Sequence, residues 1–149
     1  MKFKTSQTEI VKIINSCTKI AVKNNLNPLF ECVLLELQDH NLIIRVTNLE
    51  IVFEKNIKVL GEINGKVLIN IEVFNKIIQN INQNKDNTLE FELMNNTLII
   101  KNEDTEVELD IFSNTEYLPN IPKNKELLFN INSKIFTNLI KSVNFSANL

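Results

Sequence analysis

Apolar and polar residues follow the same order at three places in the chain. Residues 66–82 read as a short apolar strand, a polar break at Asn70 and an amphipathic helix, because the apolar side chains of the helical part recur every three or four positions. Residues 3–15 and 128–141 repeat this order. The pattern predicts a repeat of about 60 residues, with two complete copies and a third that stops just after its helix.

Each complete copy predicts one short strand, one helix and three further strands with alternating apolar side chains. The first helix is expected to begin after Ser6, with Glu9 three residues later completing a capping box. Asn95 and Asn96 predict a tight hairpin, because Asn tolerates positive φ. The predicted elements are strand 2–5, helix 7–23 and strands 26–37, 42–47 and 51–60 in the first copy, and strand 67–69, helix 71–82 and strands 89–93, 98–101 and 105–111 in the second.

The two copies predict an α+β fold, in which two βαβββ units close a common antiparallel sheet and pack both helices on one of its faces. Residues 113–125 contain Pro119 and Pro122 and read as a linker, so we expect one domain over 1–122 and the opening strand and helix of another over 123–149. The predicted core consists of Ile10, Ile14, Cys17, Phe74, Ile77, Ile78 and Ile81 on the helices, and Val33, Leu35, Leu42, Ile44 and Val46 on the strands.

Composition and charge limit the function classes. The net charge is −2 and 44% of the residues are hydrophobic, which is ordinary for a globular protein. No apolar run approaches the roughly 18 residues of a membrane span, and no stretch reads as a signal peptide, so we expect a cytoplasmic protein. Cys17 and Cys32 stand at apolar positions, as expected of buried free thiols.

No pattern in the sequence is typical of an enzyme. There is no Gly-rich phosphate loop, no nucleophile elbow, no metal-ligand spacing and no acid pair set against a basic group. His40 lies in a predicted turn without a second His or Cys nearby, so a solvated loop residue is expected there rather than a ligand. We therefore expect no catalytic site, no cofactor and no bound metal.

Positive charge gathers on the predicted helices, which hold six lysines against Glu9 and Glu72, while most other acids lie on strands and loops. Lysines on an exposed helix face can contact DNA phosphates without reading bases. The same residues also keep an amphipathic helix soluble in proteins that never meet DNA, so charge alone leaves both interpretations open. The six are Lys12, Lys19, Lys23, Lys76, Lys134 and Lys141.

A second pattern lies in short segments outside the helices. These are Pro28-Leu29, Val33-Leu34-Leu35-Glu36, Thr47-Asn48-Leu49-Glu50 and Tyr117-Leu118-Pro119-Asn120. Together with Met1-Lys2-Phe3 opening directly into a helix, their order and spacing resemble the bacterial sliding clamp, the beta subunit of DNA polymerase III. The resemblance covers the first domain of that family and the opening strand and helix of its second.

The resemblance implies a processivity factor that encircles duplex DNA as a ring, without sequence preference, and tethers the replicative polymerase during DNA replication. It implies a homodimer of the full-length protein, with DNA polymerase III subunits and the clamp loader as further partners and no chemistry of its own. Because helices line the hole of the family's ring, it also implies a DNA-facing set: Lys12, Asn15, Ser16, Lys19, Lys23, Asn24, Asn25, Lys76, Asn80, Lys134 and Lys141.

Some positions depart from the family's pattern. Asn24 and Val73 replace residues that are often basic, and the closing strand at the subunit edge, usually rich in Arg, is acidic. A clamp-derived interaction protein that keeps the fold but forms no ring is therefore the alternative. Because the third copy leaves its helix uncovered, we also expect the chain to be a fragment or a truncated gene product. The implied edge residues are Glu103, Thr105, Glu106 and Glu108.

Overall fold

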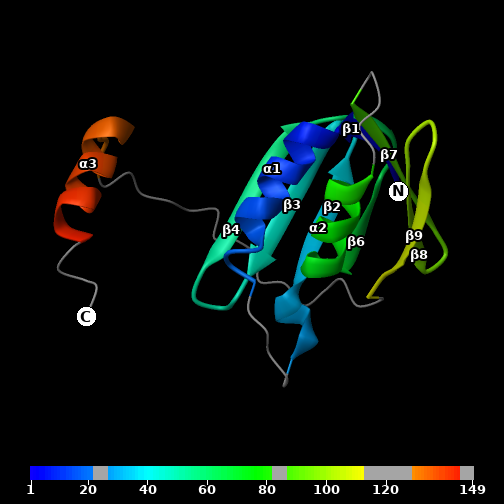
Figure 1. Cartoon of the computed structure of the whole chain (residues 1–149), viewed down its shortest axis with the longest axis horizontal. Coiled ribbons are helices and arrows are strands. Elements are labelled where there is room, and N and C mark those ends of the chain that lie inside the picture. Colours follow the sequence, from blue (N-terminus) through cyan, green and yellow to red (C-terminus); the bar gives the residue numbers. More distant parts are fainter. Residues whose placement is uncertain (22–26, 82–86, 113–128, 145–149) are drawn as a thin grey trace. The chain divides into compact units, whose positions relative to one another are not determined.

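Two antiparallel sheets and two neighbouring helices form the first of two compact units, Met1–Pro119 (Figure 1). The second unit, Asn120–Leu149, contains helix α3 (Ser133–Val143). The computed structural model describes residues 1–21, 27–81, 87–112 and 129–144.

Each of the first two copies begins with a strand that leads directly into a helix, as the repeat predicts. Strand β1 (Lys2–Ser6) runs into α1 (Gln7–Cys17), and β6 (Gly65–Asn70) runs into α2 (Ile71–Asn80). One sheet has the order β5-β1-β7-β8-β9 and the other β4-β3-β2-β6. The remaining strands are β2 (Cys32–Gln38), β3 (Asn41–Thr47), β4 (Val52–Lys58), β5 (Leu60–Ile63), β7 (Thr88–Met94), β8 (Thr97–Lys101) and β9 (Glu106–Asp110).

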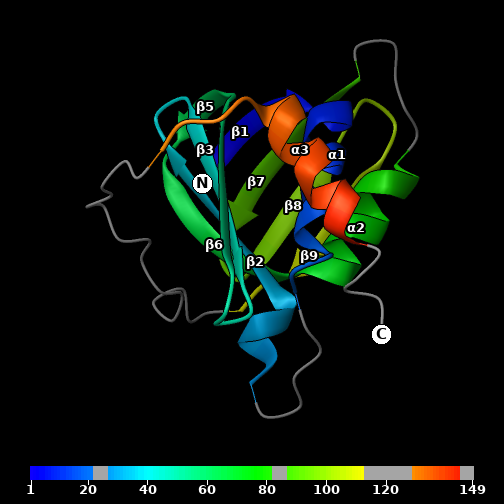
Figure 2. The ribbon, with the colours of Figure 1, turned by 90° about the vertical axis from the view of Figure 1, so that its left-hand side faces the viewer.

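Helices α1 and α2 lie side by side on the same side of the strands (Figures 1 and 2). They share one apolar core with the strands beneath them, where the rings of Phe3 and Phe91 stack with centroids 4.7 Å apart and Phe74 meets Phe91 edge-on at 6.2 Å. All predicted core residues are buried except Ile77, which is partly exposed because it lines a surface hollow beside β9.

The predicted common sheet is divided in two at Val59. The Val59 N–H donates to the His40 carbonyl at 2.9 Å, and the chain passes there from β4 into β5, so residues 51–60 are not one strand. Gly61 runs so close to Asp39 that a Cβ on it would stand 1.7 Å from the Asp39 oxygen. His40 is exposed, but its Nδ1 accepts the Gly61 N–H at 3.2 Å. Its imidazole therefore helps hold β5 where the chain passes out of β4.

Two predicted boundaries in the first copy are wrong. Helix α1 ends at Cys17 rather than at residue 23, because the Ile20 N–H bonds three residues back to the Cys17 oxygen at 3.0 Å and tightens the last turn. Strand β2 begins at Cys32 rather than at residue 26, because Pro28–Glu31 form a 3₁₀ helix. Asn27 caps that helix by accepting the Leu29 N–H at 3.1 Å.

The caps differ between the copies. Asn70 accepts the N–H groups of Glu72 and Val73, each at 3.1 Å, and so caps α2. The predicted capping box of α1 does not form: Ser6 makes no side-chain cap bond, and the Gln7 N–H donates instead to the Asn87 carbonyl at 2.8 Å. A carbonyl from the second copy thus accepts the first backbone N–H of the first helix.

Other local predictions are confirmed. Asn95 has φ 53° in the tight turn between β7 and β8. Cys17 and Cys32 are buried free thiols, and burial raises the pKa of each to about 12. The third predicted helix exists as α3, but residues 129–132 before it form no strand, since none of the described strands pairs with them.

Candidate nucleic-acid interface

Part of the predicted DNA-facing set lies on the outward side of α1 and α2 and in the turn after α1. We call these residues, all exposed, the helix face: Lys12, Asn15, Ser16, Lys19, Lys76 and Asn80. Lys12 and Lys76 lie within the helices, and Lys19 lies in the turn that follows α1. The helical period places these residues outward because Ile10, Ile14, Phe74 and Ile78 point to the core. Lys23, Asn24 and Asn25, also predicted to face DNA, lie outside the described residues.

Asn15 joins the two helices rather than standing free. Its Oδ1 accepts the Asn75 Nδ2 at 3.1 Å and the Gln79 Nε2 at 2.7 Å, and Gln79 also donates to Asn75 at 3.1 Å. Asn75 and Gln79 were not among the predicted site residues, although their spacing of four residues puts them on one side of α2. This polar seam links the exposed sides of the two helices above their shared apolar core.

The other uncharged residues of the helix face bond to their own helix. The Ser16 hydroxyl donates to the Lys12 carbonyl at 3.2 Å, and the Asn80 Nδ2 donates to the Lys76 carbonyl at 2.7 Å. Both are ordinary bonds to the carbonyl one turn back. Direct charge contact with a ligand therefore rests on the lysines.

The lysines of the helix face are not used in the fold. Lys12, Lys19 and Lys76 are exposed, and none forms an ion pair within the described part of the chain. By contrast, Lys2 and Lys4 are bound by acids of neighbouring strands, with Lys4 3.1 Å from Glu90. Exposed Lys55, Lys58 and Lys66 on β4 and β6 likewise form no ion pair among the described residues, so unpaired lysines stand on these strands as well as beside the helices. Val73, at a position often basic in the family, is 44% exposed and adds no charge.

The second unit presents Lys134 and Lys141 on α3, both exposed. Asn132 caps this helix by accepting the Lys134 N–H at 2.9 Å. The helix also exposes its apolar residues, including Ile135 at 57% and Leu139 at 55%. Within its own unit, α3 is therefore amphipathic but uncovered.

The predicted subunit edge is the last strand of its sheet. Glu106 and Glu108 of β9 are exposed, while Val107 between them is partly buried against the core. Glu103 is exposed in the turn before β9, and the Thr105 N–H, half-buried, is held by Asn102 Oδ1 at 2.8 Å. The inward alternation expected of this strand is confirmed.

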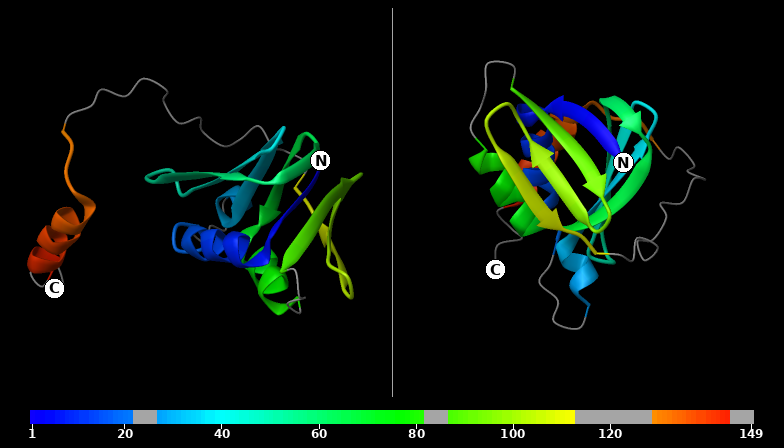
Figure 3. Two further views of the ribbon diagram at one scale, coloured as in Figure 1. Left: turned by 90° about the horizontal axis from the view of Figure 1, so that it is seen from above. Right: turned by 90° about the vertical axis from the view of Figure 1, so that its right-hand side faces the viewer.

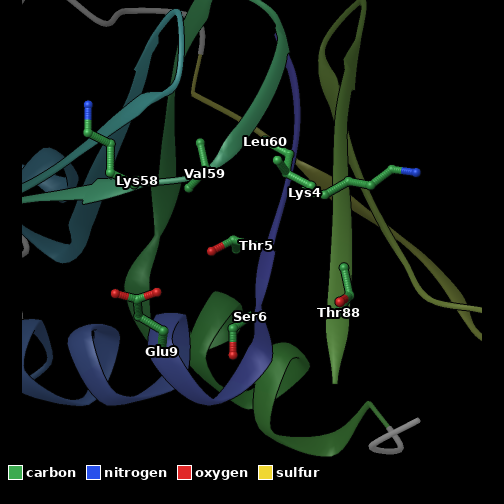
Figure 4. Close-up of a pocket in the computed structure, with 8 residues that line it drawn as sticks. All are labelled: Lys4, Thr5, Ser6, Glu9, Lys58, Val59, Leu60 and Thr88. Atoms are coloured by element: carbon green, nitrogen blue, oxygen red, sulfur yellow. The ribbon is translucent and has the colours of Figure 1, made fainter. Parts of the chain in front are cut away.

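A hollow of about 290 Å³ lies between the start of α1 and strands β1 and β5 (Figure 4). Glu9 faces it, but Lys4 and Lys58 extend away from Glu9. The Thr5 hydroxyl beside it is buried without a hydrogen-bond partner. One carboxylate without a nearby base or second acid offers no acid–base or nucleophilic arrangement.

No described helix is long and apolar enough to cross a membrane. Among these same residues, His, Cys, Asp and Glu form no group able to hold a metal ion.

Comparison with known proteins identifies the family. The family model for the N-terminal domain of the DNA polymerase III beta subunit matches residues 1–122, whereas no curated protein matches. Among solved structures, the beta clamp of Helicobacter pylori in complex with carprofen is 20% identical, with 84% of this chain and 33% of that chain covered and a TM-score of 0.74. The beta chain of Streptococcus pneumoniae DNA polymerase III is 16% identical, with 93% and 38% covered and a TM-score of 0.84.

A third structure, the DNA polymerase III beta subunit of Borrelia burgdorferi with a natural product, is 27% identical, with 76% of this chain and 31% of that chain covered and a TM-score of 0.69. The chain thus spans about a third of the length of the structures it matches. The clamp fold expected from the two βαβββ copies is confirmed. With the family model covering residues 1–122, this chain belongs to the DNA polymerase III beta subunit family.

Proposed function

We propose that the protein serves as part of a DNA sliding clamp, a non-catalytic processivity factor that holds the replicative polymerase on duplex DNA. The observation that carries the proposal is the set of unpaired lysines on the helix face, Lys12, Lys19 and Lys76, set beside two helices of a clamp-family domain. Phosphate contacts by lysine position a protein on DNA without reading its sequence, which suits a part that must slide.

The proposed partners follow from the family. They are duplex DNA, a second copy of the full-length protein, DNA polymerase III subunits and the clamp loader. The Helicobacter pylori beta clamp, similar to this chain in fold, has a structure bound to a DNA ligase peptide, which supports a role for the family as a docking platform for replication enzymes. We place the protein in the cytoplasm, where the chromosome of a bacterium is replicated.

The alternative is a clamp-derived protein that keeps the fold without encircling DNA. Val73 favours it, because a 44% exposed valine stands where the family often has a basic residue. Retention of the protein on a closed DNA circle distinguishes the two functions. A ring is retained on a nicked circular plasmid and released when the plasmid is cut, whereas a protein that contacts DNA only laterally responds equally to both forms.

Charge reversal tests the DNA contact directly. We expect the variant K12E/K19E/K76E to bind duplexes of any sequence more weakly, and the slope of log affinity against log salt to fall by up to about 3, one for each lost phosphate contact. The matched control K55E/K58E/K66E makes the same change in net charge at exposed lysines on β4 and β6. Equal losses in both variants would mean that total charge, not the helix face, drives binding.

A further inference from the structure

The hollow beside the start of α1 lies where β1 runs into α1, a junction drawn in dark blue in the left view of Figure 3. Its volume is about 290 Å³, and none of the helix-face residues lines it. Figure 4 shows the Thr5 hydroxyl and the Glu9 carboxylate directed into one space, below Val59 and Leu60. Two polar groups thus meet two apolar side chains, a combination that is common in sites for small molecules.

Thr5 is a buried polar residue without a partner. It is 6% exposed, and its Oγ1 forms no hydrogen bond with any described residue. Such a hydroxyl destabilises a fold, because it loses its bonds to water and gains none. Thr47, also buried, shows the ordinary arrangement: its Oγ1 donates to the Ile51 carbonyl at 2.9 Å and accepts the Leu49 N–H at 3.0 Å. For Thr5, the hollow is the side from which a partner can come.

Glu9 brings negative charge to the same place. It is exposed in the first turn of α1 and forms no ion pair with any residue that the structure describes. The two lysines that line the hollow do not neutralise it, since Lys4 lies 3.1 Å from Glu90 and Lys58 extends away from Glu9. A carboxylate of this kind accepts strong hydrogen bonds from a cationic donor.

The second copy shows that the fold does not require these polar residues. Thr5 is the last residue but one of β1, and the corresponding residue of β6 is Ile69, which is fully buried. Glu9 is the third residue of α1, and the third residue of α2 is Val73. The same strand-and-helix unit is thus built with apolar residues at both positions, so Thr5 and Glu9 call for a role other than folding.

We propose that this hollow binds a primary ammonium group carried on a short alkyl chain. An ammonium has several donor hydrogens, of which one bonds to the Glu9 carboxylate and another to the Thr5 hydroxyl. The alkyl chain lies against Val59 and Leu60. This chemistry is shared by free alkylamines and by the lysine side chain of another protein, whereas the charge of Glu9 disfavours carboxylate and phosphate ligands.

Titration of the whole chain with n-butylammonium tests the proposal. We expect saturable changes in the amide chemical shifts of residues 4–9 and 58–60, with a Kd on the order of 1 mM, because a ligand of few atoms gains little binding energy. n-Butanol has the same alkyl chain without the charge, so it should bind at least about tenfold more weakly. Shift changes that do not saturate, or equal binding of butanol, would overturn the proposal.

A glutamine variant tests the role of the carboxylate. Glu9→Gln keeps the shape of the side chain and removes its charge, so we expect binding of n-butylammonium to weaken at least about tenfold. The control is Glu50→Gln, at an exposed glutamate that also forms no ion pair among the described residues, and its Kd should equal that of wild type. Equal losses in both variants would mean attraction to total charge, and no loss in Glu9→Gln would mean that Glu9 is not the acceptor. Either result overturns the proposal.

A valine variant distinguishes a binding role of Thr5 from a structural one. Thr5→Val removes a hydroxyl without a partner, so we expect the melting temperature to rise by about 3 °C or more while binding of n-butylammonium weakens. Thr47→Val removes a hydroxyl that has two partners, so its melting temperature should fall instead. A Thr5→Val chain that melts at a lower temperature than wild type, or binds the amine as tightly, would overturn the role of Thr5.

A lysine analogue identifies the source of the ammonium group. Nα-acetyl-lysine amide has the same alkyl chain and ammonium as n-butylammonium, but its peptide groups must lie outside the hollow. Binding at least as tight as that of n-butylammonium supports a lysine of another protein, and weaker binding supports a free alkylamine. Binding of neither compound overturns the proposal. These assays contain no DNA, so their outcome is independent of the experiment on the helix face.

Discussion

Gln7 connects the two copies through a single buried amide. Its side chain is 2% exposed, and its Nε2 donates to the carbonyls of Ile78 at 2.9 Å and Ile81 at 2.8 Å. These carbonyls lie at the end of α2, where a helix has no partners of its own to offer. The sequence does not show this role, because a polar residue after a strand is ordinarily at the surface and its partners lie more than 70 positions away.

Replacing Gln7 should therefore lower the free energy of unfolding more than replacing a glutamine at the surface. We expect Gln7→Leu to lower the free energy of unfolding by about 1–3 kcal/mol, because two buried carbonyls lose their donor. Gln7→Glu should be at least as harmful at pH 7, since a carboxylate cannot donate. Exposed Gln38 is the control, and its leucine variant should stay within about 0.5 kcal/mol. Urea denaturation measures all three, and equal effects at both positions would contradict the role of Gln7.

At the scale of elements, an ion-pair cluster links four neighbouring strands of the larger sheet. Lys2 on β1 lies 3.5 Å from Glu62 on β5 and 3.4 Å from Glu90 on β7, while Lys101 on β8 lies 3.8 Å from Glu90. Burial by itself would raise the pKa of Glu90, but the hydrogen bond from Lys4 and the charges of Lys4 and Lys101 outweigh it and leave that pKa below the ordinary value of 4.5. These side chains meet because β5, β1, β7 and β8 are neighbours in the sheet. The local sequence does not reveal that order.

The lowered pKa predicts a loss of stability in acid. Glu90 stabilises the fold in its charged form, so its contribution is present above pH 4.5 and disappears as the pH falls through its pKa in the folded state. We expect Glu90→Gln to be about 1 kcal/mol less stable than wild type at pH 7, with the difference shrinking below pH 4.5. Unfolding measured from pH 7 to pH 3 tests this. The unpaired Glu108 gives the control, since Glu108→Gln should show no such convergence.

The elements themselves were largely predictable, because two copies of one hydrophobic pattern specify the same strand and helix twice. What the pattern could not show is contact between distant segments. The passage from β4 to β5 depends on Gly61 lying against Asp39, and the seam between the helices depends on Asn15 meeting Gln79 across 64 positions. The end of α1 was also missed, because Thr18 and Lys19 continue an acceptable helical pattern.

At the scale of the whole molecule, lysines differ in whether they form ion pairs. Among the described residues, Lys12, Lys19 and Lys76 of the helix face form none, and neither do the acids Glu106, Glu108 and Asp110 on β9. Helical spacing alone predicted that Lys12, Lys19 and Lys76 would be exposed on the two predicted helices, although Lys19 lies in the turn after α1. It could not show that these lysines are unpaired while Lys2, Lys4 and Lys101 are bound by acids, because that difference arises from the order of strands in a sheet.

The division of the chain leads to a prediction about folding. Both sheets, α1, α2 and their shared core lie within Met1–Pro119, so we propose residues 1–122 as an independent domain. A chain cut after Pro122 should keep its melting temperature within about 2 °C, since nothing of that core is removed. It should also self-associate less, because the exposed apolar residues of α3 are gone.

A second truncation supplies the control. Ending the chain at Asp104 removes β9, whose Val107 and Leu109 pack against the core, and leaves β8 as a new open edge. That chain should unfold at much lower temperature or fail to fold, since the buried apolar positions beneath β9 become exposed to water. Calorimetry of the three chains, with amide spectra of residues 1–112 in the two longer ones, distinguishes the outcomes. A drop of more than about 5 °C on cutting after Pro122 would mean that the second unit contributes to the stability of the first.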